Sequence, residues 1–113
     1  MSARRGDAIR VADILRAASR IEEVLAAGYE AFSRSWLSQS AVIRELEVIG
    51  EAAGAASASL RKDHPEVEWT RMRGFASFAK HEYWRVDPSR VWKAVTEMPS
   101  LRGKIGRVLI DPD

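Results

Sequence analysis

The residues best suited to chemistry surround His81, in the stretch FASFAKHEYWRVD from Phe75 to Asp87. Histidine can take up and release a proton near neutral pH, and nearby cations can hold a phosphate group and its developing charge. If a helix runs through this stretch, Arg73, Ser77 and His81 lie on one face at intervals of four residues. Arg85 would continue that row. RNA phosphodiester cleavage needs such a set, with a base for the ribose 2′-hydroxyl, an acid for the leaving oxygen and a cation at the phosphate.

Simpler interpretations of the same residues stay open. A single histidine on a helix is usually a surface residue or a core residue whose polar atoms are hydrogen-bonded. A cluster of basic residues is more often a solvated face than an RNA contact; here it comprises Arg61, Lys62, Arg71, Arg73, Lys80 and Arg85. The second histidine, His64, belongs to a different predicted segment, and the chain has no cysteine, so no metal-ligand set and no cysteine nucleophile is evident.

Composition narrows the class of protein. The chain has 113 residues, of which 46% are hydrophobic, and we expect a single domain over residues 1–113. Its net charge is only +2, from 18 basic and 16 acidic residues, so the chain as a whole is not a polycation. The absence of cysteine fits a reducing compartment, and no apolar run approaches the ~20 residues of a membrane span. We therefore expect a cytoplasmic protein with no membrane partner and no signal peptide.

The first half of the chain predicts two long helices. One begins at Asp7 as N-cap and ends at Gly28, with its apolar side chains at helical spacing. The second begins near Ser38 or Ser40 and carries an apolar stripe formed by Val42, Leu46, Ile49, Ala53, Ala56 and Leu60. The small residues of IGEAAGAASAS would let another helix approach closely, and Gly50 and Gly54 each weaken the helix by roughly 1 kcal/mol relative to alanine, a cost normally accepted for packing or function.

The second half predicts two more helices and a short last segment. The stretch KDHPEVEW breaks the chain because His64 precedes a proline. A third helix follows over residues 69–84, and Asp87 with Pro88 predicts the N-cap and first position of a fourth. Pro99 should end or kink that helix before a short helical segment. The fold class is therefore all-α, a bundle of four main helices, and the tryptophans serve as core or interface anchors (Trp36, Trp69, Trp84 and Trp92).

Four motifs in order resemble one known family. They are IGEAAGAAS (residues 49–57), HPEVEWTRMRGF (64–75), HEYWRVDPSRVWKAV (81–95) and MPSLRGKI (98–105). Together they resemble the HepT-like toxins of the HEPN superfamily, the RNase halves of HepT/MNT toxin–antitoxin pairs. The likeness runs from about Val42 to Leu109. It implies an α-helical bundle that forms a homodimer, with a composite, metal-independent endoribonuclease site and no cofactor of its own.

The resemblance also assigns roles to residues. The family motif is an arginine, four to six residues, a histidine, any residue and a tyrosine, commonly with an asparagine directly after the arginine. His81 then matches the catalytic histidine. Tyr83 matches the tyrosine that a partner nucleotidyltransferase of the MNT type modifies with AMP, using ATP, to silence the toxin. Arg73, Lys80 and Arg85 would contact the RNA phosphates.

The first half of the family motif does not match. The expected arginine and asparagine fall on Ala76 and Ser77, which puts catalytic activity in doubt. One explanation is engineered inactivation of a harmful RNase; the other is natural divergence, which Ser77 favours because a single alanine substitution would not leave a serine there.

Three functions follow from these observations. The first is an RNase toxin, disabled or with another cation in place of the arginine. The second is a HEPN binding module that docks a nucleotidyltransferase, a nucleotide or RNA without cutting. The third is a phosphotransfer bundle with phosphate on His81, which requires a kinase partner and leaves the HEY tripeptide unexplained.

Overall fold

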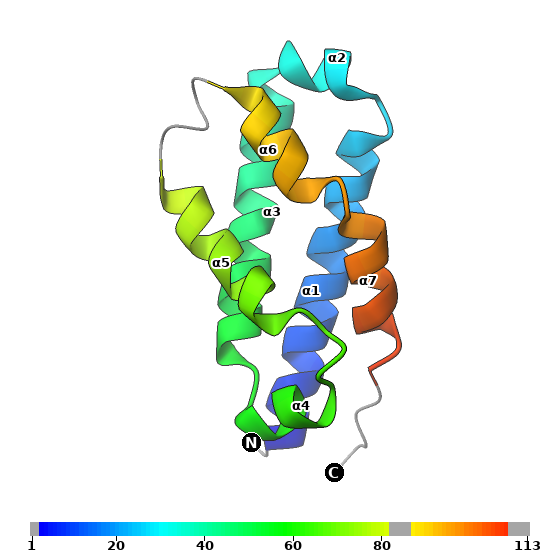
Figure 1. Ribbon diagram of the computed structural model, residues 1–113, viewed down its shortest axis with the longest axis vertical. Helices are drawn as coiled ribbons and strands as arrows, with labels where there is room; N and C mark the ends of the chain where they lie inside the picture. The colour runs from blue at the N-terminus through cyan, green and yellow to red at the C-terminus, as the bar shows by residue number, and fades with distance from the viewer. Residues whose placement is uncertain (1–2, 82–86, 109–113) are drawn as a thin grey trace.

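Helices make up the regular structure throughout the described part of the chain. The computed structural model describes residues 3–81 and 87–108. Within these ranges it has seven helices and no strand (Figure 1). They are α1 (Ala3–Leu25), α2 (Tyr29–Ser33), α3 (Trp36–Ala55), α4 (Ala58–Asp63), α5 (Trp69–Lys80), α6 (Pro88–Val95) and α7 (Met98–Gly106).

The long helices form an up-and-down bundle. In Figure 1, α1 runs upward, α3 returns downward, α5 runs upward beside α3, and α6 followed by α7 completes a fourth, downward leg. Helix α3 is central because it packs against both α1 and α5, while α7 packs against α1. The all-α bundle predicted from the sequence is confirmed, and α2 and α4 are short helices that the sequence analysis did not anticipate.

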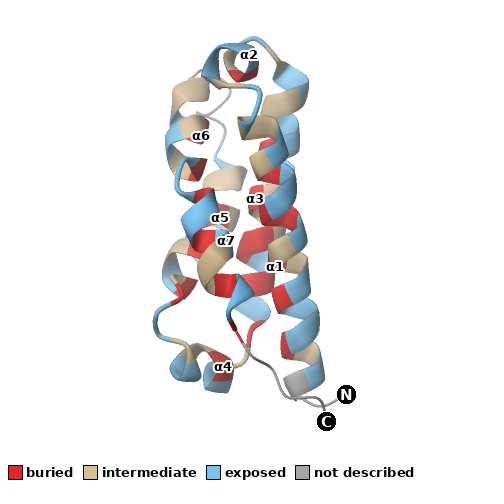
Figure 2. Ribbon diagram, turned by 90° about the vertical axis from the view of Figure 1, so that its right-hand side faces the viewer, coloured by how far each residue is buried: buried red, intermediate tan, exposed pale blue. Residues whose placement is uncertain are grey.

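The predicted apolar stripes form the core. Ile14, Ile21, Val42, Leu46 and Ile49 are fully buried. The buried residues, coloured red in Figure 2, lie along the inward faces of the long helices. Burial of these stripes is the main favourable contribution to folding, at roughly 25 cal/mol per Å² of apolar surface removed from water.

The sequence predicted Asp7 as the N-cap of the first helix, and this prediction is wrong. Helix α1 begins at Ala3, and Asp7 lies inside it as a buried carboxylate. Its Oδ1 accepts a hydrogen bond from the Ser57 backbone N–H at 2.9 Å, and its Oδ2 accepts one from the Ser57 hydroxyl at 2.6 Å. The Ser57 Oγ in turn accepts from the Leu60 N–H and caps α4. Asp7 therefore joins the start of α1 to the α3–α4 junction.

The second predicted helix starts earlier and ends earlier than expected. Ser35 is the N-cap of α3, and its hydroxyl accepts a hydrogen bond from the Ser38 N–H at 3.1 Å. Helix α3 ends at Ala55, since Ala56 has an extended backbone with φ −63° and ψ 142°. Leu60, predicted on the same stripe, is buried from α4 instead.

The start of the fourth leg is as predicted, but the role of Pro99 is different. Asp87 caps α6 by accepting from the Ser89 N–H at 3.1 Å, and the Ser89 hydroxyl holds the pKa of Asp87 below its ordinary value. Pro99 lies in the first turn of α7, where its missing N–H is tolerated, so it opens a helix instead of ending one.

The tryptophans have different environments. Trp69 is buried, and its indole N–H donates to the His64 carbonyl at 2.9 Å. Trp92 of α6 packs against the rings of Tyr29 and Phe32, with ring centroids 5.3 Å away in each case. Trp36 is 71% exposed, so it is not a core residue. Trp84 lies outside the described residues.

The membrane prediction can be compared with the helices. None of those in the described ranges is both long enough and apolar enough to cross a membrane.

Candidate functional site

The candidate site lies at the C-terminal end of α5. This helix turns Trp69, Met72 and Phe75 into the core and exposes Arg73, Ser77 and Lys80. Its sequence, WTRMRGFASFAK, contains three basic residues and no acidic one. The exposed face of α5 therefore carries positive charge among small polar and glycine residues.

His81 follows α5 instead of lying on it. It is the C-cap, with an extended backbone (φ −84°, ψ 130°), and its N–H donates to the Phe78 carbonyl at 3.2 Å. The prediction that Arg73, Ser77 and His81 form one helical row is therefore wrong at its last member. The helix predicted over residues 69–84 therefore ends at Lys80, within the residues that the structure describes. His81 is exposed at the end of the helix.

Position 76, where the family arginine is expected, packs against α3. A Cβ atom added to Gly50 would lie 2.4 Å from the Ala76 nitrogen and 2.5 Å from the Ala76 Cβ. The backbones of α3 and α5 are thus as close as glycine permits, which confirms the close helix approach predicted at Gly50. A Cβ at Gly54 would meet nothing within 4 Å, so close packing does not account for the second glycine. Ala76 itself remains partly exposed.

The predicted RNA-contacting cations differ in their distance from His81. Lys80 directly precedes His81 and is exposed. Arg73 is also exposed, but it lies eight residues before His81, about 12 Å along the helix axis at 1.5 Å per residue. Ser77 lies one turn before the histidine. Arg85 and the candidate AMP acceptor Tyr83 lie outside the described residues.

The basic cluster predicted from the sequence is not one surface. Arg61 and Lys62 belong to α4, which Figure 1 places at the opposite end of the molecule from the end of α5. Arg71 is tied to two carboxylates, Glu97 at 2.7 Å and Glu68 at 3.1 Å, and the hydrogen bond to Glu97 raises the pKa of the guanidinium. This leaves Arg73 and Lys80 as the exposed members near the candidate site.

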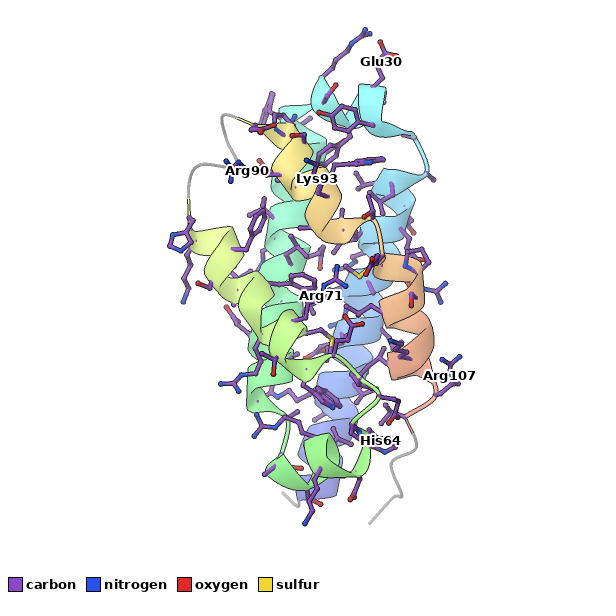
Figure 3. The ribbon with its side chains drawn as sticks, in the orientation of Figure 1. Glu30, His64, Arg71, Arg90, Lys93 and Arg107 are labelled. Atoms are coloured by element: carbon purple, nitrogen blue, oxygen red, sulfur yellow. The ribbon has the colours of Figure 1, made fainter. Side chains whose placement is uncertain are left out.

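Two further cations were missed by the sequence analysis. Arg90 and Lys93 lie on α6, which like α5 contains no acidic residue within its bounds. Figure 3 shows Arg90 extending beside the start of α6, on the side of the bundle where α5 ends. Its Nε lies 3.7 Å from the Asp87 carboxylate. The two basic residues could have been noticed in the stretch DPSRVWK, which begins four residues after the HEY tripeptide ends.

The two histidines do not share a site. His64 is the C-cap of α4, and its Nδ1 lies 3.2 Å from Glu66. It precedes α5 whereas His81 follows it, so the helix of 12 residues, about 18 Å long, separates them. A backbone hydrogen bond holds the pKa of Glu66 below its ordinary value. Among the residues that the structure describes, no three side chains form a group that could hold a metal ion.

The exposed His81 directly follows the exposed Lys80 at the end of a bundle helix, and such a pair can act on a phosphodiester. The family described as Ribonuclease HepT-like matches residues 14–108. "Probable ribonuclease HepT" of Thermococcus cleftensis is 38% identical over 98 residues, covering 85% of this chain and 89% of that protein. A protein provisionally named an RNase in Methanocaldococcus jannaschii is 33% identical, covering 82% of this chain and 87% of its own.

A third relative, provisionally named an RNase in Caldanaerobacter subterraneus, is 30% identical and covers 79% of this chain and 80% of its own length. No solved structure matches the chain significantly. The chain belongs to the HepT-like ribonuclease family.

Proposed function

We propose that this chain is the toxin component of a HepT/MNT-type toxin–antitoxin pair, built around an endoribonuclease site that two copies of the chain form together. The observation that carries the proposal is the exposed His81, which follows α5 in a chain of the HepT-like ribonuclease family. RNA is the substrate class that this family membership supports.

His81 supplies the proton transfers. As a base it takes the proton of a ribose 2′-hydroxyl, whose oxygen then attacks the adjacent phosphorus. The bond from phosphorus to the 5′-oxygen breaks, that oxygen leaves with a proton from an acid, and a 2′,3′-cyclic phosphate remains. In a homodimer the second His81 can act as this acid. The reaction requires no metal ion and no cofactor.

The alanine at position 76 should slow this reaction. Loss of one preorganised donor to a developing anion typically costs ~10² to 10³ in rate. Lys80 is the described cation next to His81 in the chain, whereas Arg73 is about two helical turns away. If this chain retains cleavage, Lys80→Ala should therefore reduce it more than Arg73→Ala does. Equal rates for the two variants would contradict a role for Lys80 at the phosphate.

Tyr83 is the proposed control point. A partner nucleotidyltransferase would transfer AMP from ATP to the Tyr83 hydroxyl, so ATP is consumed by the partner and not by this chain. Incubation with such a partner and ATP should add one or more AMP masses to the peptide that carries Tyr83. Tyr83→Phe is the matched control, because it lacks only the acceptor oxygen. An active partner that leaves the chain unmodified would contradict this relationship.

A second function is favoured by the packing of Ala76 on Gly50. Since α3 and α5 are in close backbone contact there, a small residue at position 76 already has a role in helix packing. A homodimer that binds RNA or a nucleotidyltransferase without cutting would need nothing more from this residue.

Restoring the family motif separates the two functions. We expect the double variant Ala76→Arg, Ser77→Asn to cut single-stranded RNA faster than the parent chain, by up to ~10³-fold. Because Cβ of residue 76 stays in place, the longer side chain should be accommodated through the partly exposed side of the position. The same double variant with His81→Ala should be inactive. If the restored protein is folded and does not cut, the binding-module function is the better one.

A further inference from the structure

Trp36, in the first turn of α3, is exposed to an extent that no role in the core explains. Its residue surface is 71% exposed, whereas Trp69 is 7% exposed and Trp92 packs against two aromatic rings. We propose that Trp36 is a stacking site for an unpaired base of RNA bound along the α3–α5 face. This inference rests on the proposed function, because RNA is taken as the ligand of the His81 site.

Helix geometry places Trp36 on the side of α3 that faces α5. Trp36, Ile43 and Gly50 are spaced by seven residues, which is nearly two turns, so the three project within about 40° of one another. The contact with Ala76 shows that Gly50 faces α5. These three residues form one row along α3. Ile43 and Gly50 are buried, whereas Trp36 at the start of the row is exposed.

Helix α5 ends too early to cover Trp36. Beyond Ala76, α5 continues for only four residues, or about 6 Å, while Trp36 lies 14 residues from Gly50, or about 21 Å. Trp36 is therefore roughly 15 Å beyond the end of α5 along the α3 axis. Figure 1 shows the start of α3 extending past the end of α5. At about 3.4 Å per stacked nucleotide, this distance spans about four nucleotides from His81.

Cations on α5 and α6 give this face groups that can pair with a phosphate backbone. Helices α5 and α6 contain no acidic residue within their bounds, and they contribute exposed Arg73, Lys80 and Arg90. Arg90 lies on the side of the bundle where α5 ends (Figure 3), and α6 packs against α3. An exposed aromatic ring beside a cationic track is how proteins bind single-stranded nucleic acid without reading its sequence. The alternative partner for the exposed Trp36 ring is a second copy of the chain.

Leu37 provides a matched control. It is 64% exposed and adjacent to Trp36, but it projects about 140° away from Gly50 around α3, so it faces a different side. Truncating Leu37 removes a comparably exposed apolar side chain without touching the α3–α5 face. Trp36→Phe is a second control, because phenylalanine keeps a ring on which a base can stack.

The experiment measures binding of a fluorescein-labelled, 2′-O-methylated RNA decamer by fluorescence anisotropy, since 2′-O-methyl groups prevent cleavage. Trp36→Ala should weaken binding by about 5- to 150-fold, Trp36→Phe should restore most of it, and Leu37→Ala should leave it unchanged. On a two-nucleotide probe, which is too short to reach Trp36 from His81, Trp36→Ala should have no effect.

Three results would overturn the inference. If Trp36→Ala binds the decamer as the parent chain does, the stacking site is wrong while RNA binding stands. If Trp36→Ala lowers the molar mass seen by light scattering, Trp36 anchors a contact between two copies instead. If the folded parent chain binds no RNA at all, the proposed RNase function fails together with the stacking site.

Discussion

A single methyl group at Gly50 tests the contact that positions α5. In Gly50→Ala the new Cβ would lie 2.4 Å from the Ala76 nitrogen, 2.5 Å from its Cβ and 2.8 Å from its Cα. Ordinary van der Waals contact begins at 3.4 Å, so the two helices must separate by about 1 Å. Overpacking of this kind costs up to about 3 kcal/mol, because backbone atoms cannot move aside as a flexible side chain can.

The helix itself gains from the same substitution. Alanine is favoured over glycine inside a helix by about 1 kcal/mol. Gly50→Ala should therefore lower the free energy of unfolding by about 2 kcal/mol in total. For a domain of this size we expect the melting temperature to fall by about 8 °C. Gly54→Ala is the matched control, because it adds the same methyl group to the same helix where nothing lies within 4 Å. Gly54→Ala should raise the free energy of unfolding by about 1 kcal/mol and the melting temperature by about 4 °C.

Thermal and urea denaturation of both variants distinguish steric contact from helix propensity. If Gly50→Ala is as stable as Gly54→Ala, the close contact between α3 and α5 is not present in solution and the reasoning fails. A second variant strengthens the test. Adding Ala76→Gly to Gly50→Ala removes the 2.5 Å contact but leaves the contacts to the Ala76 nitrogen and Cα, so it should rescue only part of the loss. Complete rescue would show that the backbones are not in contact.

Two further predictions concern the polar ties between helices. Asp7→Ala should destabilise the protein by about 1 to 3 kcal/mol in urea denaturation, because the Ser57 N–H loses its buried acceptor; an unchanged midpoint would contradict this. The pKa of Glu68 is held below its ordinary value of 4.5 by hydrogen bonds from Arg71 and Lys104. Its ionised form therefore stabilises the fold above pH 4.5, and this contribution is lost as the pH falls through the lowered pKa. Melting temperatures from pH 7 to 3 should fall less for Glu68→Gln than for the parent chain, and parallel curves would refute the pairing.

The fold could be predicted largely from local patterns. Apolar residues at helical spacing, the break before Pro65 and the pair Asp87–Pro88 act over a few residues, and each predicted element was found. Asp7 was misassigned because its partner Ser57 lies fifty residues away in the chain. A short polar residue near a helix start has the same local signature whether it caps its own helix or another.

The candidate site was less predictable than the fold. Its residue types were recognisable in the sequence, but the helix ends at Lys80, so His81 is not on the predicted row with Arg73 and Ser77. The sequence could not show that Arg71 is held by a carboxylate across the bundle whereas Arg73 is exposed, since the partner Glu97 comes from just before α7. The exposure of Trp36 depends on where α5 stops along α3, which is a tertiary property that the spacing of tryptophans does not contain.

The division of the fourth leg at Pro99 has a consequence for local stability. Helix α6 is held by Trp92 against two rings of the α2 segment, whereas α7 is held against α1, where Arg102 pairs with Glu22. Because the two halves have different partners, α6 can open while α7 stays docked on α1. Native-state hydrogen exchange should resolve them as separate cooperative units, with the amides of α6 less protected than those of α7. The first half of the fourth leg could then open by itself while the rest of the bundle stays folded.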